Sequence, residues 1–299
     1  MAYTSGDTIL DDHYNAFATS VNAIWGSGSG DSGYGQSSTV SSVSAGGTVQ
    51  ASQWTTLLSR CSSMASHQGS SITGISNPSA GTTISAFTAL SGNISTVTSN
   101  RLNVSSRAGN VTTNCSTTTN LTGTIEQRGT WAWGSTDQAR YFFNTGGRIS
   151  VSWDLNSYTS DTKAERWNTL ASNCGTYQVI AQSSGKSGGG GNSPNINNTN
   201  FGWHDMGGSY STVFRQYAQS TYTANYIQLD MYKTGGSVLF RSYWVDAESE
   251  QTSWNKSIYN VQDQTDGNKI TTFGHEESET SHISDSWGDG PSQTVNANG

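Results

Sequence analysis

The chain has 299 residues, a length that suits one large domain or two to three small ones. Only 12% of the residues are charged, about half of the usual share of roughly 25%, and the formal net charge is −7. The 14 basic residues are scattered and outnumbered by acids, which excludes nucleic-acid binding through clustered Lys and Arg. No apolar run approaches the roughly 20 residues of a membrane span, so we expect no membrane insertion.

Hydroxyl and amide groups replace much of the usual surface charge, because Ser, Thr, Asn and Gly provide 145 of the 299 residues. The hydrophobic content is only 32%, yet there are 10 Trp, 13 Tyr and 8 Phe and only three Pro. Disordered chains are poor in aromatic residues, and each buried ring covers about 150–250 Å². We therefore expect a folded chain with an aromatic core. The first residues, MAYTSGD, show neither the basic nor the apolar region of a secretory signal.

The first third of the chain has helical periodicity. Apolar residues recur at steps of four and three over residues 10–24, which predicts a helix with one buried face: Leu10, Tyr14, Phe17, Val21 and Ile24. A glycine-rich segment follows. A second helix is predicted over residues 50–66, with the stripe Trp54, Leu57, Leu58, Cys61 and Met64. Neither face is wide enough to stand alone, so we expect these helices to pack together or against another copy.

Residues 82–114 carry a thin apolar seam in an otherwise polar stretch. The seam has a roughly helical spacing and contains Ile84, Phe87, Leu90, Ile94 and Val97. This pattern is typical of a helix that oligomerises through a narrow contact. Two alternatives remain open. One is a helix that lies on the protein's own sheet, and the other is a pair of strands that turns at Gly92 and Asn93.

From about residue 125 the hydrophobic period changes to two. Strands are predicted over residues 148–155, 176–182, 257–261 and 269–273. The clearest hairpin joins residues 226–232 to residues 237–246 through a turn that contains Gly235 and Gly236. No helical pattern is seen between these strands. Residues 183–200 are predicted to be a long surface loop, and the tail after Gly288 to be loosely held.

This order of elements predicts an α+β fold, with N-terminal helices followed by a mainly antiparallel β-sandwich-like domain. We expect residues 1–75 to form a helical assembly or attachment region, residues 76–124 a polar connecting or coiled segment, and residues 125–299 the β-domain. The thin seam buries too little area in a monomer. It therefore predicts a homo-oligomer, with a trimer favoured.

The chain shows no HExxH or CxxC motif, which predicts a non-enzymatic protein without a cofactor. The three cysteines, Cys61, Cys115 and Cys174, are expected to be small buried thiols. Possible metal ligands are densest near the C-terminus, at His275, Glu276, Glu277, Glu279, His282, Asp285 and Asp289. A solvated acidic tail is the favoured interpretation of this set, and no metal is predicted.

Aromatic rings among Asn, Ser and Gly suit sugar binding, through ring stacking combined with hydrogen bonds. The candidates are Trp131, Trp133, Trp203, Tyr210 and Trp287, of which Trp203, Tyr210 and Trp287 are the predicted glycan contacts. The competing interpretation is that these rings form the core, because the chain has few other large apolar residues. We expect the core interpretation to hold for most of them.

Several short blocks resemble one protein family. They are residues 3–9 (YTSGDTI), 13–17 (HYNAF), 22–26 (NAIWG), 33–36 (GYGQ), 139–149 (ARYFFNTGGRI), 222–227 (YTANYI) and 284–288 (SDSWG). Each block alone is short, but together they follow the expected order along almost the whole chain. The sequence is similar in this way to tail-associated structural proteins, fibre-like or tail-tip-like, of large tailed bacteriophages.

The resemblance implies a non-enzymatic building block of a phage virion, in a tail fibre, tail tip or baseplate. Its implied partners are copies of itself and other virion proteins, and its implied location is the virion. The resemblance carries over no catalytic residues. The alternative function is a carbohydrate-binding adhesin, a receptor-binding tip that recognises host surface glycans through the aromatic residues named above.

Overall fold

The computed structural model describes residues 11–77, 79, 87–160, 162–219, 222–247 and 265–298. The chain forms two compact units. Unit 1 contains Met1–Gly109, Asp137–Gly147 and Glu277–Gly290, and unit 2 contains Asn110–Thr136, Arg148–Glu276 and Pro291–Gly299. The chain thus passes between the units five times, and the units do not follow the consecutive order 1–75, 76–124 and 125–299. The expected α+β class is confirmed, with helices and two mainly antiparallel sheets.

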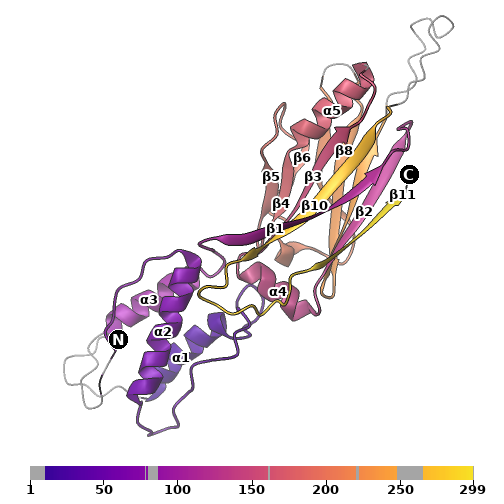
Figure 1. The fold of residues 1–299 in the computed structure, drawn as a ribbon. Coiled ribbons are helices and arrows are strands. Elements are labelled where there is room, and N and C mark those ends of the chain that lie inside the picture. Colours follow the sequence, from indigo (N-terminus) through magenta and orange to yellow (C-terminus); the bar gives the residue numbers. More distant parts are fainter. Residues whose placement is uncertain are drawn as a thin grey trace, which may run out of the picture. The chain divides into compact units, whose positions relative to one another are not determined.

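Unit 1 is built around three helices, α1 (Asp11–Trp25), α2 (Ala51–Gln68) and α3 (Phe87–Ser99), which pack against one another (Figure 1). The two helices predicted near the N-terminus are confirmed. Their packing buries Tyr14 and Val21 of α1 together with Trp54 of α2. Helix α2 ends at Gly69, whose φ of 65° is a left-handed conformation that favours glycine. A fourth helix, α4 (Thr136–Asn144), adds Phe142 and Phe143 to the core of unit 1.

Helix α3 is shorter than the predicted stretch of residues 82–114. It ends at Ser99, and strand β1 (Arg107–Thr117) follows. The segment around Val111, Thr112 and Thr113 is rich in β-branched residues, which favour strands over helices because their side chains are stiff near the backbone. The alternative of a strand pair turning at Gly92 and Asn93 is wrong, since both residues lie inside α3.

Unit 2 is a sandwich of two sheets (Figure 1). The five-stranded sheet has the order β1-β10-β3-β4-β5, and the six-stranded sheet has the order β11-β2-β9-β8-β7-β6. The strands not yet given are β2 (Thr124–Ala132), β3 (Arg148–Asn156), β4 (Thr176–Val179), β5 (Ser184–Ser187), β6 (Ile196–Asn197), β7 (Ser211–Tyr217), β8 (Tyr226–Thr234), β9 (Ser237–Val245), β10 (Asn268–Ser278) and β11 (Ser292–Asn298).

The core between the sheets is aromatic, as the composition predicts. Trp153 of β3 stacks on Phe214 of β7 with ring centroids 5.1 Å apart, and Trp131 of β2 meets Phe273 of β10 edge-on at 5.3 Å. One amide side chain, that of Gln127, forms several hydrogen bonds within this core. Gln127 accepts hydrogen bonds from Trp244 Nε1 at 3.1 Å and Thr271 Oγ1 at 2.6 Å, and donates to the carbonyl of Lys269 at 2.7 Å. A buried amide with several partners avoids the cost of an unpaired polar group.

The predicted strands 148–155, 176–182 and 269–273 correspond to β3, β4 and β10, and the hairpin of β8 and β9 is confirmed around Gly235 and Gly236. The predicted strand at residues 257–261 lies outside the described residues. Three other expectations are wrong. The loop 183–200 contains β5 and β6, the tail after Gly288 forms β11 on the edge of β2, and α4 and α5 (Thr162–Cys174) interrupt the strands.

Helix α5 packs against β3, β7 and β8, with Trp167 5.8 Å from Trp244 between ring centroids. Its buried positions have helical spacing: Ala164, Trp167, Leu170, Ala171 and Cys174. Two of these residues are alanine and one is cysteine. Small side chains add little to a hydrophobic pattern, so the sequence signal for this helix is weak, although the helix is well packed in the fold.

Candidate functional site

The strongest candidate for a binding surface in unit 2 is the side of the six-stranded sheet that faces away from the core. Successive side chains of a strand point to opposite faces. In β2 the buried residues Ile125, Gln127 and Trp131 alternate with half-buried ones, and β8 and β9 alternate in the same way. The half-buried residues form what we name the outer sheet face: Glu126, Arg128, Thr130, Arg215, Tyr217, Tyr226, Gln228, Asp230, Tyr232, Leu239, Arg241 and Tyr243.

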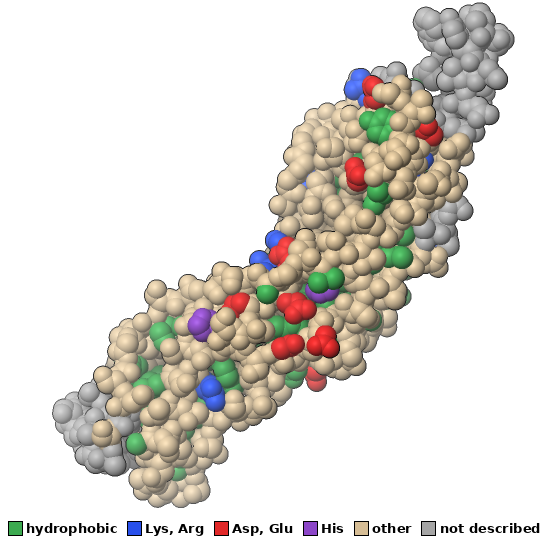
Figure 2. All heavy atoms as spheres, in the orientation of Figure 1, with side chains coloured by type: hydrophobic (Ala, Val, Ile, Leu, Met, Phe, Trp, Pro, Cys, Tyr) green, Lys and Arg blue, Asp and Glu red, His purple; other side chains and the backbone are tan. Residues whose placement is uncertain are grey.

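The strand register arranges the outer sheet face in rows. One row runs from Glu126 through Tyr243 and Gln228 to Arg215, and the next places Arg128 opposite Arg241. Neighbouring strands lie about 4.8 Å apart, so the side chains of one row contact one another directly. Three of the 14 basic residues of the chain therefore gather on one sheet face. Most of the surface visible in Figure 2 is tan, the colour of the backbone and of side chains that are neither charged nor hydrophobic.

Ion pairs and ring contacts hold the arginines of this face in place. Glu126 Oε1 lies 2.5 Å from Arg128 Nε and 3.2 Å from Arg241 Nε, so one carboxylate serves two guanidinium groups. The Arg241 guanidinium carbon lies 4.0 Å from the centroid of the Tyr210 ring, and that of Arg215 lies 5.0 Å from the Tyr226 ring. Guanidinium groups that stack on aromatic rings keep their edges available for hydrogen bonds.

A pocket of about 330 Å³ opens on the outer sheet face beside Tyr210. It is lined by Arg128, Gly129, Thr130, Tyr210, Tyr232, Leu239, Phe240, Arg241, Thr294, Val295 and Asn296. Tyr210 and Tyr232 meet edge-on with their centroids 4.4 Å apart and form an aromatic wall. Burial raises the pKa of Tyr210 against the lowering effect of Arg241, so its phenol stays protonated and able to donate at neutral pH.

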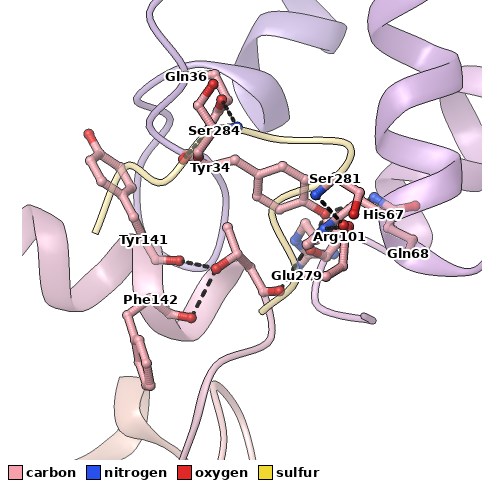
Figure 3. A network of polar contacts seen from close by, with 11 residues as sticks. Tyr34, Gln36, His67, Gln68, Arg101, Tyr141, Phe142, Glu279, Ser281 and Ser284 are labelled. Carbon is pink, nitrogen blue, oxygen red and sulfur yellow. Dashed lines mark hydrogen bonds and ion pairs between the residues drawn. The ribbon is translucent and has the colours of Figure 1, made fainter. Parts of the chain in front are cut away.

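Unit 1 contains a buried polar network of a different kind (Figure 3). His67 of α2 is fully buried, with Nδ1 2.8 Å from Glu279 Oε1 and Nε2 2.9 Å from the carbonyl oxygen of Thr145. Burial lowers the pKa of His67, against the raising effects of Glu279 and the Thr145 carbonyl. Burial would raise the pKa of Glu279, but hydrogen bonds from His67 and from the Ser281 N–H hold it below the usual value.

Tyr34 continues this network. Its hydroxyl donates to the carbonyl oxygen of Arg101 at 2.6 Å and accepts from Gln68 Nε2 at 2.9 Å, and its ring lies edge-on to His67. Because His67 and Tyr34 are buried, they cannot meet a dissolved substrate. The network is better suited to fastening distant chain segments than to catalysis.

Two of the three predicted glycan contacts belong to the core. Trp203 and Trp287 are 4% and 1% exposed, and Trp131 and Trp133 are buried as well, so no sugar can stack on these rings. The Trp203 ring instead lies 4.2 Å from the ammonium of Lys233. Tyr210 alone among the three lies on a solvent-facing surface, in the pocket described above. For the tryptophans the competing core interpretation is therefore correct.

The seam residues are packed inside unit 1. Leu90, Ile94 and Val97 are buried on α3, which packs against α1 and α2, and the ring of Phe87 lies 4.5 Å from that of Phe17. Ile84 lies outside the described residues. The seam is thus covered by other helices of the same chain. It is not an exposed stripe, and the alternative of a helix lying on the protein's own sheet is wrong as well. The expected homo-oligomer remains a prediction, but it can no longer rest on this seam.

The C-terminal set of possible metal ligands is dispersed among other partners. Glu276 pairs with Arg148 at 2.6 Å, Glu277 accepts from Trp287 Nε1 at 3.2 Å, and Glu279 pairs with His67. Within the part of the chain that the structure describes, no group of three His, Cys, Asp or Glu side chains is placed to hold a metal ion. The cysteines Cys61, Cys115 and Cys174 are buried free thiols, as predicted.

No sequence motif identified Arg128, Tyr232 or Arg241 as site residues. A signal was present, because the polar positions of two alternating strands carry Glu126 and Arg128 in one and Arg241 and Tyr243 in the other. In a chain with so few charges, such strands are conspicuous. Their proximity still depends on the pairing of β2 with β9, which lie more than one hundred residues apart in sequence.

None of the helices in the described part of the chain combines the length and the apolar composition that crossing a membrane requires. Comparison with protein-family models, with curated proteins and with solved structures gave no match to this chain.

Proposed function

We propose that the chain is a non-enzymatic structural component of a phage virion, associated with a tail fibre, tail tip or baseplate and assembling as a homo-oligomer. The short sequence blocks that resemble such proteins are the first support for this proposal. The second support is the position of three of these blocks in the fold. Residues 33–36, 139–149 and 284–288 are distant in sequence, yet most of their residues belong to unit 1, where they contact one another.

The contacts between these blocks are specific. Gln36 and Ser284 exchange two hydrogen bonds, of 2.7 and 2.8 Å, and Asn144 Nδ2 donates to the carbonyl of Gly33 at 3.2 Å (Figure 3 shows Gln36 and Ser284). Gly35 has a φ of 72°, and a Cβ there would lie 2.5 Å from the Tyr141 ring. Residues that interlock in this way constrain one another. Their joint resemblance to one family is therefore more specific than the short blocks are separately.

This proposal is tested on purified particles from a host culture that expresses the chain. We expect peptides of this protein to co-purify with intact particles, in a fixed molar ratio to other tail proteins, after a density gradient. Antibodies against the purified protein should label the tail or its tip in electron micrographs. A protein that stays in the lysate and is lost from gradient-purified particles would contradict a structural role.

A second function, the attachment of glycans, is favoured by the outer sheet face. Tyrosine rings, guanidinium groups and amides stand there in register, and the Tyr210 pocket opens among them. Binding sites for small ligands combine aromatic walls with a few oriented polar groups in this way. Such a surface suits a receptor-binding part of a virion, and we propose Tyr210 as its glycan contact instead of Trp203 and Trp287.

A further inference from the structure

We propose that the Tyr210 pocket binds a sugar unit that carries a carboxylate, within an acidic surface polysaccharide. The inference rests on the glycan attachment proposed above and names the class of glycan. It depends on three features of the pocket, which are the charge of its lining, the stacking of its arginines and the polar groups around its aromatic wall.

The charge of the pocket favours an anion. Arg128 and Arg241 are direct cross-strand neighbours, and like charges in that position repel. Glu126 contacts both guanidinium groups but does not line the pocket, and Asp230 is the cross-strand neighbour of Arg241 on β8. Among the described residues that line the pocket, two are arginines and none is acidic. Glu126 and Asp230 offset this repulsion from outside the pocket, and an anion in the pocket would reduce it further.

The arginines are accessible enough to bind it. Their side chains are 40% exposed for Arg128 and 34% for Arg241, and the Arg241 guanidinium carbon lies over the Tyr210 ring, 4.0 Å from its centroid. A planar guanidinium presents paired N–H groups that match the two oxygens of a carboxylate, and a pre-positioned one loses less conformational entropy on binding. A carboxylate therefore satisfies this pair better than a neutral hydroxyl does.

The rest of the lining suits a sugar ring. Tyr210 and Tyr232 offer aromatic surface, and Leu239 adds an aliphatic contact. Thr130, Thr294 and Asn296 supply hydroxyl and amide groups, which donate and accept hydrogen bonds as sugar hydroxyls require. A volume of about 330 Å³ is near the lower end of the range of roughly 300–1,000 Å³ for ligand pockets, so the pocket suits a short glycan unit more than a long segment.

The test uses the full chain and matched polysaccharides. Polymers that contain glucuronate, galacturonate or sialate are immobilised beside their carboxyl-reduced counterparts, which have the same linkages but no charge. We expect the protein to bind at least one acidic polymer about tenfold or more tightly than its reduced form. Arg128→Gln, Arg241→Gln and Tyr210→Ala should each weaken that binding by about tenfold, which corresponds to roughly 1.4 kcal/mol.

Arg215→Gln is the matched control. Arg215 lies on the outer sheet face and stacks on Tyr226, but it does not line the pocket. We expect this variant to bind like the wild type, and all four variants to remain folded, because the substituted side chains are half-buried surface groups.

The other outcomes separate the two levels of the proposal. Equal binding to acidic and reduced polymers would overturn the carboxylate inference while keeping glycan attachment. Tighter binding to sulfated polymers would also overturn it, and so would a loss of binding in Arg215→Gln as large as in the pocket variants. Binding to no polymer of the panel would contradict both the acidic sugar and the glycan attachment on which it rests.

Discussion

Lys269 is a buried residue whose charged ammonium group is stabilised by hydrogen bonds to the backbone. Its ammonium lies 2.6–3.1 Å from four backbone carbonyl oxygens, those of Thr119, Thr265, Asp266 and Gly267. Burial lowers the pKa of Lys269 to about 8, against the raising effect of Asp266. The lysine thereby fastens the turn before β10 to the connection between β1 and β2. The Lys269 ammonium is thus the cation that these four carbonyl oxygens surround.

His67 and Glu279 make the stability of unit 1 sensitive to acid. Both groups bind protons less readily in the folded chain than in the unfolded one, because the pKa of each is lowered on folding. The unfolded state therefore takes up more protons as the pH falls. We expect the free energy of unfolding to be highest above pH 6.5, the ordinary pKa of histidine, and to decrease below it. A further decrease should follow below pH 4.5, the ordinary pKa of glutamate.

Urea unfolding at a series of pH values measures this profile. Glu279→Gln should cost about 1.5–3 kcal/mol at neutral pH, the usual contribution of a hydrogen bond to a charged group, and should flatten the profile below pH 4.5. Asp137→Asn is the control in the same unit, because its side chain is 67% exposed, and its profile should run parallel to that of the wild type. If Glu279→Gln and the wild type kept a constant difference down to pH 3, the assignment would be wrong.

At the scale of elements, helix α3 shows how one hydrophobic pattern can serve two architectures. A narrow stripe of apolar residues can join helices of different copies, as in a coiled coil, or helices of one chain. In this protein Leu90, Ile94 and Val97 are buried in the bundle with α1 and α2. A change in the stripe should therefore unfold unit 1 instead of separating subunits.

Leu90→Ala tests this consequence. Removing a fully buried leucine leaves a cavity, and we expect a loss of about 2–5 kcal/mol in the free energy of unfolding. Ser91→Ala changes an exposed neighbour on the same helix and should alter stability by no more than about 0.5 kcal/mol. Thermal unfolding followed by circular dichroism compares the two. A Leu90→Ala protein that is as stable as the wild type, but of lower molar mass, would restore the seam as a contact between copies.

At the scale of the whole molecule, the proposed virion role predicts self-assembly. Light scattering coupled to size-exclusion chromatography gives the molar mass directly, and we expect a mass three times the 31.8 kDa of one chain. The physical reason is that fibres and tail tips are built from symmetric copies, which close a ring of identical interfaces. A mass of 31.8 kDa at all concentrations would contradict a stable trimer in solution and leave assembly to the particle.

Much of the secondary structure could be predicted from the sequence, because hydrophobic periodicity is a local property. The alternation of Ile227, Leu229 and Met231, followed by Gly235 and Gly236, was sufficient to predict the β8–β9 hairpin. The stripe of α2, from Trp54 to Met64, was equally clear. Helix α5 was missed because much of its buried face consists of small residues, and β11 was missed because the polar segment around Thr294 shows no alternation that predicts a strand.

The sequence by itself determined the α+β class, the aromatic core and the low surface charge, since each follows from composition and local pattern. The tertiary structure alone decided what each apolar face packs against and which polar residues meet. The helices α1 and α2 cover the stripe of α3, Trp203 and Trp287 enter the core, and the pairing of β2 with β9 places Arg128 beside Arg241. Such contacts join residues far apart in the chain, and the register that sets them depends on the pairing of whole strands, which no local pattern specifies.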